Sequence, residues 1–463
     1  MSSSTLVWVM DFESEKLTLQ TSDDWSEYRS LSLSPGGFRN RRIEIWVLHA
    51  QAQLVPENSV DHESLTHRDE RQIRLDTERS FVLYPVDSET EKDTLQSELH
   101  DLLVEIFRKR PKLNYFQGYH DIITVLLLTL PRELQLPCAE QLSLQRVRDS
   151  MGSTLEPVLG LLRVMKNLLR LADPQFAELL ERTSPLPYYA LPNLLTLFSH
   201  DMPTLPLIQH VFDYLLCRPP IFVVYLASAI ILSRKQDVER LQEEGEEGMM
   251  HSLLSALPEM VDDDSATEAG TESPPLDPEG QAPMTRLSTS PEPSTHESES
   301  PSPEPRRKVV KRNPQSLTSI LNMSDALHQA HPPSHPSLQL SSTMGPQSVI
   351  FTWSTNMSDM PGSDEAECMV EWVDLIVYPE PPVANNDKEK RTQKPRRKRF
   401  KRRVGTPTVG MIVGAGLVLG VAVAVSVYGA RQNGDHTRDW RKIGRWVGGA
   451  FAGASERIMN YET

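Results

Sequence analysis

The chain has 463 residues, which could hold two or three domains, and a formal net charge of −15 at pH 7. Many of its 36 prolines lie between residues 270 and 400, so a hydrophobic core can occupy only part of this length. The three cysteines have no paired spacing, which argues against a disulfide framework or a zinc site and favours a reducing, cytosolic setting for the main domain.

Residues 36–260 are the predicted folded domain, and residues 1–35 are an amino-terminal extension. The apolar run at residues 6–10 is too short for a signal peptide and lacks a basic flank. The domain is rich in Leu, Ile and Val, and no alternating strand pattern occurs between residues 90 and 245. We therefore expect an all-α fold.

The first long helix is predicted to begin near Asp93 and Gln96, which resemble a capping box, and to end at Pro111. Further helices are predicted over residues 122–130, 155–171, 175–181, 206–216 and 221–244. The chain has no GxxxxGK(S/T) loop, so we do not expect it to be an NTPase itself.

Residues 261–387 are predicted to be a linker, acidic and then Ser/Pro-rich, that is mostly disordered. Its stretch over residues 262–304 holds eleven acidic groups against a single arginine. Within the rest of it, residues 317–331 could form a short helix, and residues 349–353 and 369–378 are apolar enough to dock on another surface.

A single transmembrane helix is predicted over residues 409–430, which carry no charge. Twenty-two helical residues span roughly 33 Å, enough for the hydrocarbon core of a bilayer. The alternative, a buried helix of a soluble domain, has no other core nearby in the sequence. The segment before the span, residues 388–408, is basic and would hold that side in the cytosol.

The alternative for the basic segment, a nuclear-import or nucleic-acid patch, fits its position before an apolar span less well. We therefore expect no nucleic-acid partner. Residues 431–463 form a short tail that could lie in the membrane interface as an amphipathic helix or be a loose luminal tail.

Two motifs in the domain carry the functional prediction. Residues 73–79 read Ile-Arg-Leu-Asp-Thr-Glu-Arg, and residues 115–121 read Tyr-Phe-Gln-Gly-Tyr-His-Asp. An arginine supplied to another protein neutralises charge on a transferring phosphoryl group, and a glutamine amide can orient the attacking water. Alone, a helical arginine is usually a solvated residue or surface ion pair, and Gln-Gly is usually a turn. Their order, spacing and helical context together favour a role in GTP hydrolysis by a partner.

The two motifs resemble the fingerprint of the TBC domain, the catalytic module of Rab GTPase-activating proteins. In that family IxxDxxR supplies an arginine finger and YxQG a glutamine finger. The resemblance extends over roughly residues 36–260 and implies a GTP-loaded Rab small GTPase as partner. It implies that the catalytic residues are Arg79 and Gln117, supported by Asp76, Tyr115, Gly118 and Asp121. GTP and magnesium would belong to the Rab, and the chain would have no cofactor of its own.

Other residues near the motifs admit a second interpretation or depart from the family pattern. His120 could be a general base with Asp121 as its partner, but no metal-ligand spacing accompanies them, and we interpret both as structural. The family usually has an arginine where this chain has His210, and a tryptophan where it has Asn193. These two departures bear on domain packing or Rab contact more than on the fingers.

More narrowly, residues 119–122 and the downstream segment resemble a membrane-anchored branch of the family that includes fungal members. That resemblance implies the endoplasmic reticulum membrane, or the early Golgi, and traffic between these compartments. The alternative function is a catalytically idle, membrane-anchored scaffold that binds a Rab or another trafficking partner. Intact Arg79 and Gln117 argue against the idle scaffold.

Overall fold

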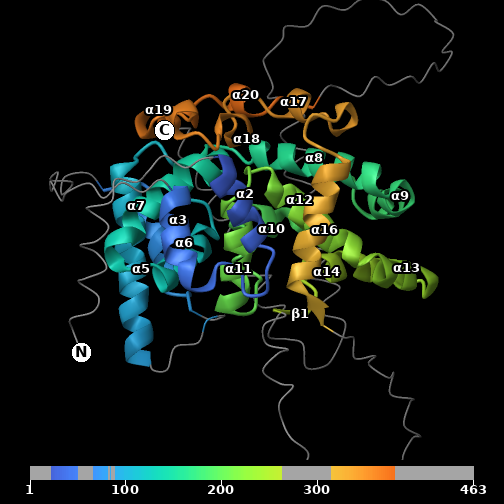
Figure 1. Ribbon diagram of the computed structural model, residues 1–463, viewed down its shortest axis with the longest axis horizontal. Helices are drawn as coiled ribbons and strands as arrows, with labels where there is room; N and C mark the ends of the chain where they lie inside the picture. Colours follow the sequence, from blue (N-terminus) through green and yellow to red (C-terminus); the bar gives the residue numbers. More distant parts are fainter. Residues whose placement is uncertain (1–21, 51–65, 82–83, 85–88, 263–313, 381–463) are drawn as a thin grey trace, which may run out of the picture. The chain divides into compact units, whose positions relative to one another are not determined.

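The computed structural model describes residues 22–50, 66–81, 84, 89–262 and 314–380, and their regular structure is almost entirely helical (Figure 1). The helices before the linker are α2 (Ser22–Leu31), α3 (Arg42–Ala50), α4 (Glu70–Thr77), α5 (Glu89–Lys109), α6 (Tyr119–Thr129), α7 (Arg132–Leu142), α8 (Glu156–Ala172), α9 (Pro174–Thr183), α10 (Leu191–Thr196), α11 (Leu205–Leu216), α12 (Phe222–Ser233), α13 (Lys235–Glu243) and α14 (Met250–Ser255). The turns η2 (Ser143–Val147) and η3 (Arg148–Met151) join α7 to α8. The predicted all-α class is confirmed for the helical domain.

After the linker come α16 (Leu317–Ala330), α17 (Leu340–Thr343), α18 (Val349–Thr352), α19 (Ser363–Met369) and α20 (Val373–Ile376). The strands of the described residues are β1 (Met260–Val261) and β2 (Gln315–Ser316), which pair in parallel. This pair of strands joins the residues before the linker to those after it, so the chain leaves the domain and re-enters it at the same place.

The core is built around helices that are apolar on every side. In α12 the ten residues from Phe222 to Ile231 are all buried, and α6 buries seven residues. A helix that is hydrophobic all round belongs to the interior. Amphipathic helices surround them, such as α8, which packs against α12 with one face and exposes Arg170 on the other.

The predicted helix boundaries agree with α6, α8, α9 and α11 to within three residues. Two predictions are wrong. The helix expected over residues 221–244 is divided at Arg234 into α12 and α13. The Arg234 guanidinium donates to Asp237 and to the Ala256 carbonyl. The capping box is also absent, because α5 begins at Glu89 and Gln96 lies inside the helix.

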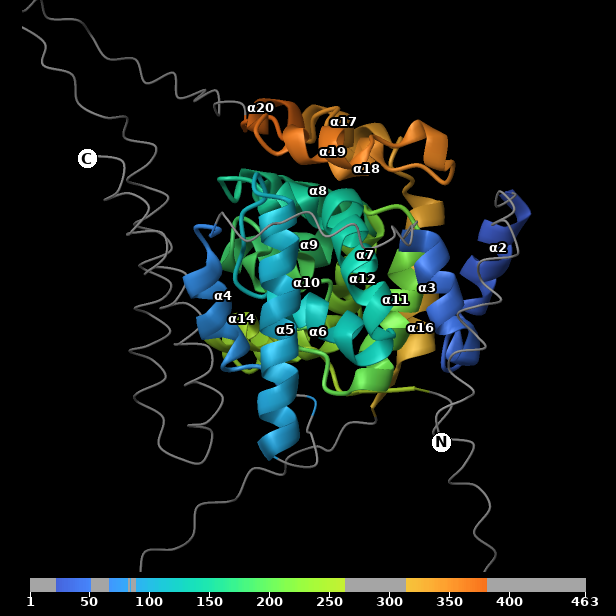
Figure 2. The ribbon, with the colours of Figure 1, turned by 90° about the vertical axis from the view of Figure 1, so that its left-hand side faces the viewer.

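The carboxy-terminal half of the predicted linker is folded, in contrast to the expectation for residues 261–387. Leu317, Ile320 and Leu321 are buried and recur at helical spacing, and α16 packs along α12. Figures 1 and 2 show α17 and α20 lying over α8. The amino-terminal boundary differs as well, because Trp25 of α2 is buried in the same core.

The two positions that depart from the family pattern are both interior residues. His210 is fully buried, with Nε2 at 3.0 Å from the Ser32 carbonyl and Nδ1 at 3.1 Å from Asp262. Asn193 is buried on α10. Both positions therefore serve the packing of the domain.

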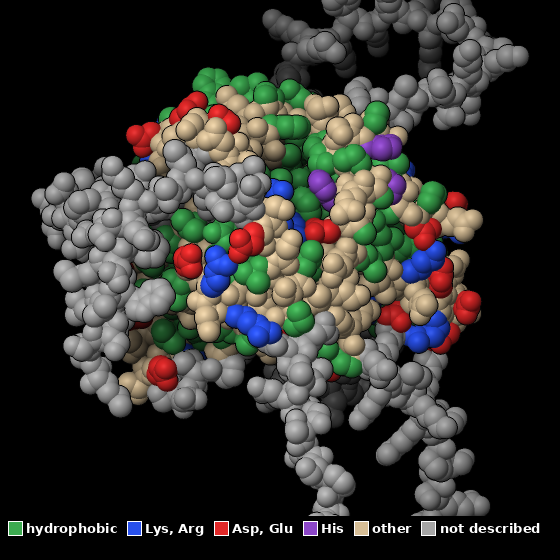
Figure 3. Space-filling model, viewed as in Figure 1, with side chains coloured by type: hydrophobic (Ala, Val, Ile, Leu, Met, Phe, Trp, Pro, Cys, Tyr) green, Lys and Arg blue, Asp and Glu red, His purple; other side chains and the backbone are tan. Residues whose placement is uncertain are grey.

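Residues 1–380 form one structural unit and residues 381–463 a second, of which nothing is described. Among the described residues, no helix combines the length and apolar character needed to cross a bilayer. The predicted span 409–430, the basic segment 388–408 and the tail 431–463 lie outside the described residues, as do residues 263–313 of the linker. On the face seen in Figure 3, acidic and basic side chains of the described residues are interspersed.

Candidate functional site: two motifs joined by a buried carboxylate

Arg79 lies two residues beyond the end of α4, in the turn that closes the helix. Its backbone N–H donates to the Asp76 carbonyl at 3.1 Å. Its side chain is 47 % exposed, with Nε donating to the Leu75 carbonyl at 2.9 Å and Nη2 to the Asp76 carboxylate at 2.5 Å. Gln96 of α5 donates to the carbonyls of Glu78 and Ser80, on either side of Arg79. The backbone at Arg79 is thus fixed, while the guanidinium reaches solvent.

Asp76 connects the two motifs. It is buried, and its Oδ1 accepts from Arg79 and from Gln72 Nε2 at 3.1 Å. Its Oδ2 accepts from the Tyr115 hydroxyl at 2.8 Å. A buried carboxylate requires such donors, because an unpaired one loses its hydration without compensation. One side chain of the first motif therefore bonds both its own arginine and the tyrosine of the second.

Tyr115 is held at its backbone as well as its hydroxyl. Its N–H donates at 2.9 Å to Oδ2 of Asp69, which is the residue just before α4. The hydroxyl also lies 3.0 Å from His120 Nδ1. Burial, together with the neighbouring Asp76 carboxylate, raises the pKa of the Tyr115 phenol well above its ordinary value. The phenol therefore stays protonated and can donate to Asp76 throughout the physiological pH range.

Gln117 and Gly118 form the turn that leads into α6. Gly118 has φ +99°, and a Cβ placed there would lie 2.7 Å from Thr196 Cγ2, so glycine is required on two grounds. The Gln117 Oε1 atom is buried and has no hydrogen-bond partner among the described residues. An unpaired buried acceptor costs about 1–3 kcal/mol, so a hydrogen bond from a donor outside the described residues would stabilise this amide.

Asp121, in the first turn of α6, lies between two histidines. His120 Nε2 is 3.3 Å from its Oδ1, and His200 Nδ1 is 2.7 Å from its Oδ2. Burial acts to raise the pKa of the Asp121 carboxyl, but the charge of His120 and the hydrogen bond from His200 outweigh it and leave the pKa below its ordinary value. Asp121 thus joins α6 to the segment after α10, which supports the structural interpretation of His120 and Asp121.

Strained backbone gathers around these residues. Leu197 and Phe198, three and two residues before His200, have φ values of 49° and 70°, and Phe81, two residues after Arg79, has φ 61°. Positive φ outside glycine costs on the order of 1–3 kcal/mol and persists only where the surroundings impose it. Tyr84 donates to the Ser199 carbonyl at 3.3 Å, which ties the two strained segments together.

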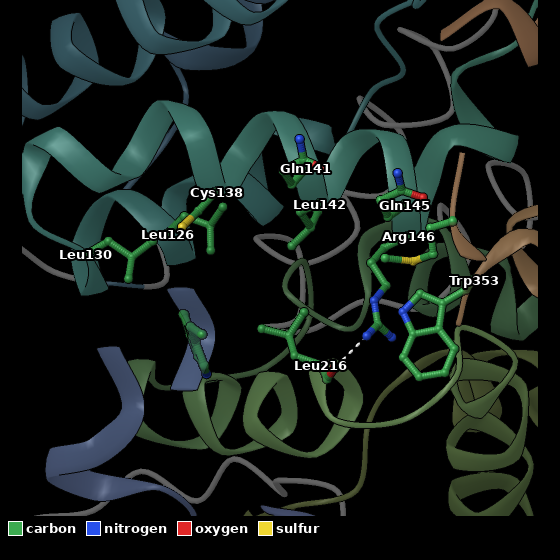
Figure 4. A pocket seen from close by; sticks show the side chains of 11 residues that line it. Leu126, Leu130, Cys138, Gln141, Leu142, Gln145, Arg146, Leu216 and Trp353 are labelled. Atoms are coloured by element: carbon green, nitrogen blue, oxygen red, sulfur yellow. Dashed lines mark hydrogen bonds between the residues drawn. The ribbon is translucent and has the colours of Figure 1, made fainter. Parts of the chain in front are cut away.

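A pocket between α7 and α11 is lined by residues outside the two motifs (Figure 4). Its cavity is about 20 Å³, room for roughly one water. The Arg146 guanidinium stacks on Trp353 at 4.8 Å and donates to the Leu216 carbonyl, and burial lowers its pKa to about 9. The pocket is too small for a substrate. Among the described residues, no group of three or more His, Cys, Asp or Glu could hold a metal.

The structure brings the predicted Arg79, Asp76 and Tyr115 into one hydrogen-bonded set, and it places Gln117 two residues along the chain from Tyr115. Sequence reasoning missed the roles of supporting residues, namely Asp69, Gln72, Gln96 and His200. Asp69 and Gln72 lie at helical spacing before Asp76, a signal that could have identified them. His200 offered no such signal, because its partner is 79 positions away.

Comparison with known proteins finds similarity over the region of the chain that contains both motifs. Residues 41–239 match the Rab-GTPase-TBC domain. The chain is 34% identical over 197 residues to the GTPase-activating protein gyp10 of Schizosaccharomyces pombe, covering 42% of this chain and 52% of that one. It is 28% identical over 241 residues to TBC1 domain family member 20 of Homo sapiens, covering 51% and 59%.

A third relative is the GTPase-activating protein GYP8 of Saccharomyces cerevisiae, 30% identical over 199 residues and covering 38% of this chain and 40% of that one. The chain thus matches little more than half the length of the first two relatives and less of the third. A solved structure of a Chlamydomonas flagellar RabGAP TBC domain aligns with 54% of this chain and 88% of its own, at 14% identity and a TM-score of 0.33.

Proposed function

We propose that the protein is a GTPase-activating protein for a Rab-family small GTPase, since its residues 41–239 match the Rab-GTPase-TBC domain. Two of the relatives described above carry the name GTPase-activating protein. The partner is a GTP-loaded Rab, which brings its own nucleotide and magnesium ion.

One observation carries the proposal. The Asp76 carboxylate bonds both Arg79 and Tyr115, so the turn that presents the arginine and the loop that presents Gln117 are fixed against each other. The supporting side chains Asp76 and Tyr115 are buried and hydrogen-bonded to each other. The Arg79 side chain is half exposed, and Gln117 Oε1 has no partner among the described residues. This division suits residues that act on a second protein.

Arg79 acts by charge. The transferring γ-phosphoryl group accumulates negative charge in the transition state, and a planar guanidinium with five donors binds its oxygens in a fixed geometry. An arginine supplied in trans accelerates hydrolysis by about 10³–10⁵, which corresponds to roughly 4–7 kcal/mol of barrier. Asp76 restricts the guanidinium before the Rab arrives, so less conformational entropy is lost on binding.

Gln117 acts by orientation. A carboxamide donates through its nitrogen and accepts through its oxygen, so it can bond a water and a backbone group of the Rab at once. Its position in the turn before α6 is fixed by the glycine that follows it and by the Tyr115 bonds before it. Neither finger exchanges a proton in this chemistry.

The first test uses the full chain, purified in mild detergent, with a panel of GTP-loaded Rabs and single-turnover measurement of phosphate release. Arg79→Ala and Gln117→Ala are each expected to lower the stimulated rate by at least about a hundredfold. Arg182→Ala, at an exposed arginine on α9, is the matched control and is expected to retain the wild-type rate. The assignment would be overturned if Arg79→Ala and Gln117→Ala each stimulated hydrolysis as well as the wild type does. It would also be overturned if the wild type stimulated no Rab.

The alternative function, an idle scaffold, gives a separate result in the same assay. A chain that binds a GTP-loaded Rab without changing its rate of hydrolysis, and binds equally well as Arg79→Ala, would be a scaffold. Rab binding accompanied by acceleration that depends on both fingers excludes the scaffold.

We propose further that the protein is anchored in the endoplasmic reticulum or early Golgi membrane through residues 409–430, with its TBC domain in the cytosol. The uncharged run of 22 residues and the basic segment before it support this topology. A glycosylation acceptor placed after residue 431 is expected to be modified in intact cells. An unmodified acceptor would contradict a luminal tail.

A further inference from the structure

The connection between α5 and α6, residues 110–118, carries Gln117 and is held by distant parts of the chain. Lys112 N–H donates to Glu367 Oε1 at 2.9 Å. Asn114 N–H donates to the Met151 carbonyl at 2.8 Å, and Tyr115 N–H donates to Asp69 at 2.9 Å. Three amides within four residues thus have acceptors remote in sequence. Two of these acceptors lie inside the matched domain, and Glu367 lies 128 residues beyond its end.

Glu367 is well placed to fix this connection. It lies on α19 and is only 7 % exposed. Its second oxygen is 3.3 Å from Arg110 Nη1, while Arg110 also bonds Glu140 of α7 at 2.6 Å. The carboxylate therefore spans the beginning of the connection, accepting one side-chain and one backbone donor. Hydrogen bonds to a buried ionised group are the stronger kind.

The helix that carries Glu367 is itself fixed to the domain. Gln141 donates to Ser363 Oγ and Gln145 to the Pro361 carbonyl, each at 3.1 Å. Arg148, fully buried, donates to the Gln347 carbonyl at 2.8 Å. The first two bonds join the start of α19 to the end of α7 and the turn after it, so α19 has a defined position next to the connection.

Other charged contacts between α19 and the connection lie at the surface. Arg110 pairs with Asp364, whose side chain is 97 % exposed, and Lys112 Nζ pairs with Glu371, which is 55 % exposed. Exposed ion pairs contribute about 0–1 kcal/mol. The bond from Lys112 N–H to the buried Glu367 carboxylate is therefore the contact that restricts the backbone.

We propose that Glu367 is a positioning residue for Gln117, and that residues 314–380 are part of the functional GTPase-activating unit. This inference rests on the proposed function. Glu367 touches neither nucleotide nor Rab and acts by holding the connection, five residues before Gln117, in the conformation that presents the amide. A chain ending at residue 313 would keep both fingers and lose this restraint.

The first measurement is independent of any Rab. Hydrogen–deuterium exchange of the full chain is followed in the peptide covering residues 111–116 and, as an internal reference, in α12. Glu367→Ala is expected to speed exchange of that peptide about tenfold, the effect of losing one hydrogen bond to a charged group. Glu365→Ala is the matched control, since Glu365 lies exposed on the same helix and its charge acts on Arg148 and not on the connection. Unchanged exchange in Glu367→Ala would overturn the proposal.

The second measurement uses the Rab that the panel identifies. Glu367→Ala is expected to lower kcat about tenfold with little change in KM, because a small displacement of a positioned group costs rate more than binding. Glu367→Gln keeps an oxygen that can accept from Lys112 N–H and is expected to stay within about threefold of wild type. If Glu367→Ala speeds exchange both in the peptide and in α12, the substitution has destabilised the whole protein. The kcat of Glu367→Gln then decides whether Glu367 positions Gln117. A folded Gln variant as slow as the Ala variant, or an unchanged kcat in both, would overturn the positioning role. If no Rab responds even to the wild type, the proposed function fails, and the exchange experiment still decides whether Glu367 holds the connection.

Discussion

Tyr115→Phe removes a single hydroxyl at the point where the two motifs meet. In the wild type that hydroxyl donates to Asp76 Oδ2 at 2.8 Å and lies 3.0 Å from His120 Nδ1. His120 Nδ1 lies 4.0 Å from Oδ2, beyond hydrogen-bond reach, so it does not replace the lost hydroxyl. The buried carboxylate therefore keeps one oxygen without a donor.

The expected cost follows from the charge on the acceptor. A hydrogen bond to an ionised group contributes about 1.5–3 kcal/mol to stability, so we expect Tyr115→Phe to lower the free energy of unfolding by about 2 kcal/mol. For a domain of this size that is a decrease in Tm of roughly 4–8 °C. Because Tyr115 also restrains the loop before Gln117, we expect kcat to decrease about tenfold while KM for the Rab stays nearly constant.

Tyr225→Phe is the matched control. Tyr225 is buried on α12, and its hydroxyl donates to a neutral acceptor, the His331 carbonyl, at 2.6 Å. Its loss is expected to cost only about 1 kcal/mol and to leave kcat unchanged. The assays are thermal unfolding followed by near-UV circular dichroism and single-turnover hydrolysis. If Tyr225→Phe destabilised the protein as much as Tyr115→Phe, or if Tyr115→Phe retained full kcat, the argument from the buried carboxylate would be refuted.

Three further substitutions test the surroundings of the site. Gly118→Ala is expected to cost about 2 kcal/mol or more, since the position combines φ +99° with a 2.7 Å approach to Thr196, and a melt within about 1 °C of wild type would contradict this. The hydrogen bond from Arg108 lowers the pKa of Glu70 below its ordinary 4.5, so the unfolded chain binds the proton more tightly. The resulting stabilisation is complete above about pH 4.5 and disappears as the pH falls through the lowered pKa; Glu70→Gln is expected to flatten the acid side of a plot of Tm against pH, and an identical slope would refute the role of the pair. Leu321→Ala, at a fully buried position of α16, is expected to cost about 2–5 kcal/mol, and a loss below 0.5 kcal/mol, measured by denaturant unfolding, would show that α16 does not belong to the core.

The helices and the motif chemistry could be predicted because both depend on local pattern. Apolar residues at helical spacing define α6, α8, α9 and α11, and their ends lie close to prolines or a capping aspartate, Asp173, that the sequence displays. The fold of residues 314–380 could not be predicted as a whole. Its buried residues, such as Leu321, Leu338 and Met344, are spread among short helices and loops, so none of the short segments has enough periodicity to stand out from the linker.

Contacts made through an irregular backbone were also beyond prediction. The bond from His200 to Asp121 depends on two consecutive left-handed residues, Leu197 and Phe198, and neither residue type favours that conformation. The hydrogen bonds of Gln96 are a second case that the sequence could not predict. Its position three residues after Asp93 suggested a local cap, but its amide instead donates to carbonyls on either side of Arg79. A tertiary acceptor used the side chain for a role that no local pattern encodes.

These supporting contacts have a common consequence for a residue that must act on another protein. Gln96 and Asp76 fix the backbone and one edge of the Arg79 guanidinium, and Tyr115 and Glu367 fix the loop before Gln117. Strained backbone on both sides of the site shows that the surrounding packing holds a conformation that the local sequence does not favour. The ordering entropy of the two turns is therefore lost when the chain folds and not when a Rab binds. Only the ends of two side chains remain to be ordered in the complex, and this explains why substitutions in the supporting residues should lower kcat and leave KM nearly unchanged.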